Sequence, residues 1–179
     1  MIYIITALKP EAQAFVEFYK LKKSRLGNFT LFSNEHIKLI ISGLGVTNAR
    51  VATQTLINHF DITDEDIYVN VGICGANKSF ALGEVLEVGE IIYEEIPYFF
   101  KPNKQSILCS NTPVDKTNAN LADMESFGVY DAVVHSPAIK NFYIIKVVSD
   151  HFEPHLVTKE ATKALLFNAI NEIHTIIQN

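Results

Sequence analysis

The sequence comprises 179 residues, of which 48% are hydrophobic and 20% are charged, with a formal net charge of −5 at pH 7. This composition is typical of a folded globular protein and not of a disordered chain. The acidic balance argues against a nucleic-acid binder, because such a protein normally carries a basic face. The length suits one domain with a sizeable core, so we expect residues 1–179 to form a single domain.

The sequence does not predict a membrane or an exported protein. Its apolar runs stay shorter than the roughly 18 residues that span a bilayer. The start, MIYIITALKPE, lacks the basic and long apolar regions of a signal peptide. Cys74 and Cys109 are far apart and do not have the spacing of metal ligands. We therefore expect a cytoplasmic, reduced protein that uses no metal or other cofactor, with both cysteines packed inside it.

Apolar runs alternate with helical spacing in the first half of the chain. In chain order, the predicted elements are a strand at Ile2–Ala7, a helix at Lys9–Tyr19, a hairpin of Phe29–Ser33 and His36–Ser42, a helix at Thr47–Phe60 and a strand at Ile67–Ile73. Pro10 suits the first turn of the first helix, where its missing N–H costs nothing. The basic run Lys20–Lys23 is interpreted as the solvated end of that helix.

The second half continues the alternation but is less regular. It is predicted to contain a strand-rich segment at Gly83–Glu94, an irregular segment at Glu95–Gln105, a short strand at Ser106–Cys109, a polar loop at Asn111–Asn120, a helix at Leu121–His135, a strand at Asn141–Ser149 and a helix at Val157–Ile177. Strands that alternate with helices indicate the α/β class, here a mixed central β-sheet flanked by helices.

The strand at Asn141–Ser149 is the most informative segment, because Ser149, Asp150 and His151 follow its apolar run. In open α/β sheets, ligand sites form at the carboxyl ends of such strands. An aspartate in this position also serves commonly as a helix N-cap. Both roles of Asp150 stay open on this segment alone.

Further segments lie at element boundaries in a consistent order: ALKPE (Ala7–Glu11), SGLGVTNA (Ser42–Ala49), VNVGICGA (Val69–Ala76), MESFGVY (Met124–Tyr130) and VVSDH (Val147–His151). Together they resemble the nucleoside phosphorylase/nucleosidase superfamily, and most of all its methylthioadenosine/S-adenosylhomocysteine nucleosidases. The resemblance runs over nearly the whole chain and implies a pocket for a small nucleoside. It implies that the pocket is lined by Ala7, Gly45, Gly72, Ile73, Cys74 and Gly75.

The resemblance also implies roles for three carboxylates. Glu11 matches the glutamate that activates water, although a glutamate in a first helical turn can merely complement the helix dipole. Glu125 matches the ligand of the ribose 2′- and 3′-hydroxyls, with Met124 packed on the sugar. Asp150 matches the acid that protonates the purine while the ribose becomes oxocarbenium-like, and Ser149 would orient it by hydrogen bonding.

Two positions argue against phosphate as the nucleophile. Bacterial purine nucleoside phosphorylases carry an arginine where this sequence has Asn70 and a serine where it has Ile73. Arginine binds phosphate through a charged fork, which Asn70 cannot replace, and the side chain of Ile73 forms no hydrogen bond. Water is the remaining common nucleophile, so the residues favour hydrolysis over phosphorolysis.

The segment from Ile91 to Met124 is much shorter than its counterpart in the resembling family, where it supplies an aromatic that stacks on the base. Phe99, Phe100 or Phe127 could take that place. The apolar run Ile91–Phe100 would also leave an exposed patch on a monomer. We therefore expect a homodimer that buries Tyr98, Phe99 and Phe100, unless these rings fold back on their own core.

The leading functional hypothesis is hydrolysis of the N-glycosidic bond of a purine nucleoside by water, with a 5′-modified adenosine such as methylthioadenosine or S-adenosylhomocysteine as the substrate. A futalosine-type hydrolase fits the same residues. A purine nucleoside phosphorylase and a catalytically silent nucleoside-binding relative are two further hypotheses. Retention of all three carboxylates argues against the silent relative.

Overall fold

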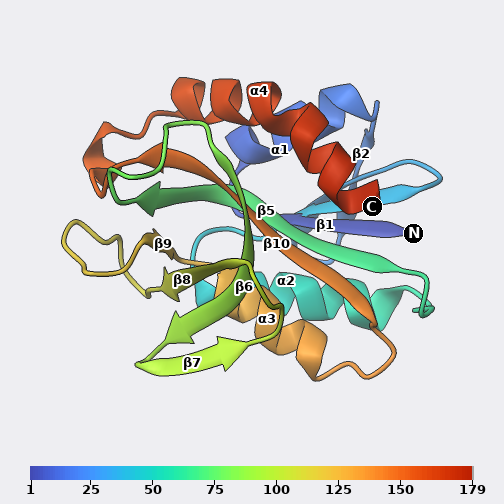
Figure 1. Ribbon diagram of the computed structural model, residues 1–179. Helices are drawn as coiled ribbons and strands as arrows, with labels where there is room; N and C mark the ends of the chain where they lie inside the picture. The colour runs from blue at the N-terminus through green and yellow to red at the C-terminus, as the bar shows by residue number, and fades with distance from the viewer. Residues whose placement is uncertain (179) are drawn as a thin grey trace.

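The structure, a computed structural model, describes residues 1–178 as one mixed β-sheet with helices on both of its faces (Figure 1). The strands are β1 (Ile2–Thr6), β2 (Lys22–Leu26), β3 (Phe29–Ser33), β4 (Ile37–Ile41), β5 (Ile67–Ala76), β6 (Val85–Tyr93), β7 (Ile96–Phe99), β8 (Gln105–Cys109), β9 (Leu121–Asp123) and β10 (Asn141–Asp150). The helices are α1 (Lys9–Phe18), α2 (Val46–His59), α3 (Ser126–Val134), the 3-10 turn η1 (Pro154–Leu156) and α4 (Lys159–Gln178). The predicted α/β class with a mixed, helix-flanked sheet is confirmed.

The centre of the sheet is parallel. Strand β1 pairs in parallel with β4 and β5, and β5 pairs in parallel with β10. Strands β3 and β2 extend the β4 edge as an antiparallel meander. On the other side, the pairings β5–β10, β10–β6, β6–β8, β8–β9 and β9–β5 form a closed circuit of strands. The carboxyl ends of β1, β5 and β10 therefore meet at one edge.

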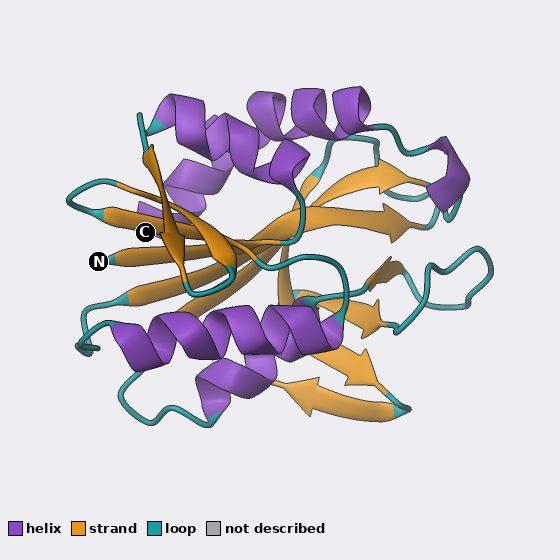
Figure 2. Ribbon diagram, turned by 180° about the vertical axis from the view of Figure 1, so that it is seen from behind, coloured by secondary structure: helices purple, strands orange, loops and turns teal. Residues whose placement is uncertain are grey.

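Each face of the sheet is covered by a pair of helices, as Figure 2 shows from behind. Helices α1 and α4 pack on one face, where Phe15 and Ile173 are fully buried against Val69 of β5. Helices α2 and α3 pack on the other face, where Leu56 and Val133 lie over Tyr68. No helix within residues 1–178 is both long enough and apolar enough to cross a membrane.

Three predictions of local structure were wrong. Lys22–Leu26 is not a helix end but strand β2, whose exposed lysines suit a sheet edge. The segment Glu95–Gln105 is not wholly irregular, because β7 pairs with β6 as an edge strand, the place in a sheet that tolerates Pro97. The helix expected to begin at Leu121 begins at Ser126 instead, after the three-residue strand β9.

The two cysteines are free and buried, in agreement with their expected packing role. Cys74 lies on β5 and Cys109 at the end of β8. Burial raises the pKa of each thiol well above its ordinary value. At neutral pH both therefore stay protonated and unreactive.

Candidate active site

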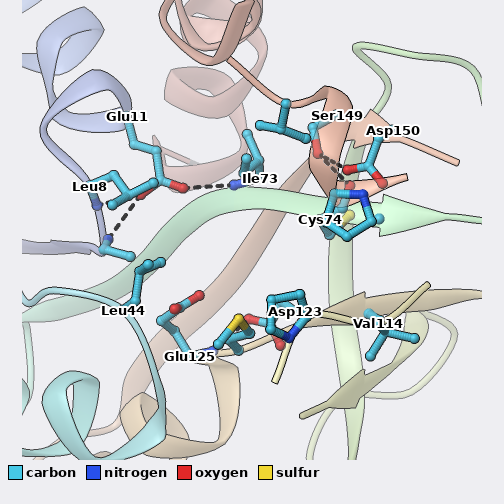
Figure 3. A pocket seen from close by; sticks show the side chains of 17 residues that line it. Leu8, Glu11, Leu44, Ile73, Cys74, Val114, Asp123, Glu125, Ser149 and Asp150 are labelled. Atoms are coloured by element: carbon cyan, nitrogen blue, oxygen red, sulfur yellow. Dashed lines mark hydrogen bonds between the residues drawn. The ribbon is translucent and has the colours of Figure 1, made fainter. Parts of the chain in front are cut away.

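A cavity of about 210 Å³ lies at the carboxyl ends of β1, β5 and β10 (Figure 3). Both catalytic candidates, Glu11 and Asp150, line it. So do the predicted binding residues Ala7, Ile73, Cys74, Gly75, Met124, Glu125 and Ser149. Gly45 and Gly72 do not line the cavity, but each contacts a carboxylate that does. The sequence motifs thus converge on one pocket.

Glu11 is the third residue of α1, and its side chain is buried. Its Oε2 accepts the N–H groups of Ala7 and Leu8 at 2.9 and 2.8 Å, and its Oε1 accepts the N–H of Ile73 at 3.0 Å. The bond to Leu8 is one half of a capping box. Burial raises the pKa of Glu11, although these N–H groups and the charge of Lys146 act in the opposite direction.

Gly72 allows this arrangement because it has no side chain. A Cβ atom there would lie 2.9 Å from Oε1 of Glu11 and 3.7 Å from Nζ of Lys146. Any other residue would push the Glu11 carboxylate away from the N–H of Ile73. A glycine is therefore required at position 72 by the close approach of the Glu11 carboxylate, and not by an unusual backbone angle.

Glu125 precedes the first turn of α3 and lies on the other side of the pocket from Glu11 (Figure 3). Its Oε1 accepts the N–H of Gly45 at 2.8 Å, and Gly45 is the residue before α2, with φ at +94°, which favours glycine. Burial and, next, the nearby charge of Asp123 raise the pKa of Glu125 to about 7. The side chain of Glu125 lines the pocket.

A buried lysine joins these carboxylates, and the sequence interpretation missed it. Lys146 forms an ion pair with Asp123, with 2.7 Å between Nζ and Oδ2, and both side chains are almost fully excluded from solvent. Its Nζ also donates to Oδ1 of Asn70 at 2.8 Å. Burial disfavours its charge, but Asp123 and Glu125 outweigh burial, so the pKa of Lys146 lies above its ordinary value. The available signal was a lysine inside the apolar run of β10.

Asp150 stands at the end of β10 with a hydrogen bond on each oxygen. Ser149 Oγ lies 2.6 Å from Oδ2, so the hydrogen bond expected between these two residues is present, and the N–H of Glu153 donates to Oδ1 at 2.7 Å. The second bond closes a turn before η1. Asp150 therefore caps a turn, not an α-helix, and still faces the pocket.

None of the three phenylalanines considered for stacking on a base lines the pocket, so that expectation was wrong. Phe99 is 68% exposed, Phe100 packs on Phe142 with ring centres 5.1 Å apart, and Phe127 stacks on Tyr93 at 4.1 Å. The apolar part of the pocket wall is aliphatic instead: Leu8, Leu44, Pro113, Val114, Pro154 and Val157. Within residues 1–178, no cluster of three or more His, Cys, Asp or Glu side chains could hold a metal ion.

Comparison with solved structures identifies the architecture. The 5′-methylthioadenosine/S-adenosylhomocysteine nucleosidase of Helicobacter pylori superimposes with a TM-score of 0.80 at 13% identity, over 99% of this chain and 97% of that one. The chain has the nucleosidase fold. The Neisseria meningitidis nucleosidase, at 18% identity and a TM-score of 0.72, covers 94% of this chain and 96% of its own.

Sequence comparison also finds similarity to a nucleosidase, over part of the chain. A methylthioadenosine/S-adenosylhomocysteine nucleosidase of Staphylococcus carnosus is 34% identical over 92 residues, which are 51% of this chain and 35% of that protein. The match therefore spans about a third of the relative's length. No protein-family model matches the chain.

The nucleosidase fold is shared by enzymes with different substrates. The futalosine hydrolase of Helicobacter pylori matches this chain as well as the methylthioadenosine enzymes do, with a TM-score of 0.81 at 13% identity over 99% of this chain and 97% of that one. The fold that the motifs lead us to expect is confirmed. The fold therefore does not identify a substrate, and only the residues that line the pocket can indicate one.

Proposed function

We propose that this chain is an N-glycosidase that hydrolyses a purine nucleoside with water as the nucleophile. The observation that carries the proposal is the placement of Glu11 and Asp150 on opposite sides of one pocket, with Glu125 between α2 and α3 facing the same space (Figure 3). A base, an acid and a ligand for ribose hydroxyls are the groups that cleavage of a glycosidic bond requires.

In this proposal Glu11 is the general base. An ionised carboxylate offers about four lone-pair sites, and three of those of Glu11 are taken by backbone N–H groups. The remaining site can accept a proton from water. Lys146 donates to Asp123 and Asn70, which leaves the third hydrogen of its ammonium group for a further acceptor, and its positive charge favours the ionised form of Glu11.

Asp150 then acts as the general acid. As the bond between C1′ and the base breaks, Asp150 gives its proton to the purine ring, and the hydroxide part of water bonds to C1′ while Glu11 takes the water proton. The products are free base and free sugar. Glu125 accepts hydrogen bonds from the ribose hydroxyls through the oxygen that Gly45 does not occupy.

The surroundings of Asn70 support water over phosphate. Its amide oxygen accepts from Lys146 at 2.8 Å, and its amide nitrogen donates to the carbonyl oxygen of Ile5 at 3.2 Å. Asn70 is thus occupied inside the protein and carries no charge for an anion. Ile73 adds only an apolar side chain to the pocket.

We propose a 5′-modified adenosine, such as methylthioadenosine or S-adenosylhomocysteine, as the substrate. The aliphatic wall of Leu44, Val114 and Val157 suits the apolar methylthio group of methylthioadenosine. The named relatives act on methylthioadenosine and S-adenosylhomocysteine. The fold match to futalosine hydrolase makes futalosine the second candidate. Release of free base from a panel of both classes, measured with and without phosphate, tests the proposal; base release from none of them would refute it.

The proposal includes a homodimer and a cytoplasmic location. Among the three aromatics expected at the dimer contact, Tyr98 and Phe100 pack against Phe127 and Phe142 of the same chain. Phe99 and Ile96 of the edge strand β7 are 68% and 54% exposed and are the apolar residues left for a second copy. The two free thiols suit a reducing compartment.

A further inference from the structure

The turn that follows β10 is fastened to the last residues of β5. Ser149 Oγ lies 3.1 Å from the carbonyl oxygen of Cys74. Nδ1 of His151 lies 3.3 Å from the carbonyl oxygen of Ala76 and donates to it in the tautomer that carries a proton there. Asp150 is therefore flanked on both sides in the sequence by residues that contact the neighbouring strand.

Phe152 supplies a third contact, to the residue between those two. A Cβ atom built on Gly75 would lie 3.1 Å from Cδ1 and 3.5 Å from Cε1 of the Phe152 ring. The same point lies 3.4 Å from Oδ1 of Asp150. The edge of the aromatic ring and one carboxylate oxygen thus both approach the same point over the bare backbone of Gly75.

The backbone of Phe152 is strained at this position, inside the turn that the N–H of Glu153 closes with Asp150. Its φ is +59°, in the left-handed region that a bulky residue rarely adopts. Glycine would make the same turn without strain. Such conformations persist where the surroundings demand them, and they gather at functional sites. Here the residue with the strained angle places its ring over Gly75, which Oδ1 of Asp150 also approaches.

We propose that Phe152 is the positioning residue for Asp150. Its ring occupies the space over Gly75 that Oδ1 of Asp150 also approaches and, together with the hydrogen bonds from Ser149 and from the N–H of Glu153, holds the carboxyl group toward the pocket. Phe152 does not itself line the cavity, so it acts through Asp150. The inference rests on the proposed function, in which Asp150 is the acid. A misplacement of about 1 Å in a reacting group can cost 10²-fold in rate.

The test is the variant Phe152→Gly, which removes the ring and accepts the positive φ without strain, so the fold should hold and the melting temperature should not fall. We expect kcat on the best nucleoside of the panel to fall roughly 10–10²-fold, with KM changed by less than about threefold. Phe152→Tyr keeps the ring and should retain the parental kcat. Glu95→Gly, at the exposed hairpin residue with φ at +66°, is the matched control and should leave kcat unchanged.

Two further measurements separate positioning from general packing. In an Asp150→Asn background, Phe152→Gly should cause no additional loss of kcat, because the group it positions is already disabled. A full additional loss there, or a parental kcat in the single variant, would overturn the inference. If the parental chain releases no base from any nucleoside, the proposed function fails. Crystal structures of the parent and of Phe152→Gly then still test whether Phe152 positions Asp150. An Asp150 carboxyl group that keeps both of its hydrogen bonds in the variant would overturn that inference.

Discussion

Replacing Lys146 by methionine should destabilise the folded chain strongly. Methionine fills nearly the same space but removes the charge that neutralises Asp123, which is shielded from solvent together with its partner. The amide oxygen of Asn70 loses its donor as well. Removing one member of a buried pair typically costs about 3–5 kcal/mol, because the other charge stays buried without a partner.

That loss is large compared with the stability of a typical domain, about 5–15 kcal/mol. For a chain of this size, each kcal/mol lowers the melting temperature by about 2–4 °C, so the fall should be about 6–20 °C. Urea unfolding followed by circular dichroism gives the free energy of unfolding of the parent and the Lys146→Met variant directly.

A surface ion pair provides the control. Lys163 lies 3.7 Å from Glu17, both side chains are about half exposed, and Lys163→Met should cost less than about 1 kcal/mol. The double variant Lys146→Met with Asp123→Asn should be more stable than Lys146→Met alone, because the orphaned charge is gone. If Lys146→Met lowers the free energy of unfolding no more than Lys163→Met does, the buried ion pair does not contribute the stability that we assign to it.

Three more outcomes are expected. Asp150→Asn should lower turnover of purine nucleosides by roughly 10²-fold or more while the chain stays folded; activity within a few-fold of the parent would leave Asp150 as a turn cap only. KM for a ribonucleoside should rise as pH falls below about 7, because protonated Glu125 loses acceptor capacity, whereas KM of Glu125→Gln should be flat over that range. Light scattering at micromolar concentration should give twice the 20.1 kDa chain mass and, for Phe99→Ser, a shift toward the monomer; a monomeric parent would remove the dimer.

The elements that the sequence predicted well are those whose own residues carry the pattern. The apolar runs of β1, β5 and β10 and the helical spacing of α1 and α2 lie in the chain itself, and the structure places them within a few residues of the expected bounds. Strands β2, β7 and β9 were not predicted, because they are short and form only through hydrogen bonds to a neighbouring strand. Leu121–Asp123, for example, becomes a strand only between β5 and β8.

The same division holds for the site. Glu11, Glu125 and Asp150 could be found because each stands in a local motif at the end of a strand or the start of a helix. The pairing of Lys146 with Asp123 could not be found in this way. The two residues come from different strands, and no local motif around either one indicates an ion pair. The candidate stacking rings lie outside the pocket for a similar reason, because Phe127 and Phe100 pack against rings from other parts of the chain.

The structure also changes how capping and catalysis are weighed against each other. Glu11 lies in the first turn of α1, as its simpler interpretation required, and also accepts the N–H of Leu8 there. Asp150 closes a turn and does not cap the helix that its simpler interpretation required. In both cases the backbone N–H groups use some lone pairs of the carboxylate and thereby fix its rotamer. The lone pairs that remain are then available at the pocket in a fixed direction. Capping and chemistry are therefore compatible roles of one side chain, and an amide substitution, which keeps an acceptor oxygen but cannot exchange a carboxylic proton, separates them.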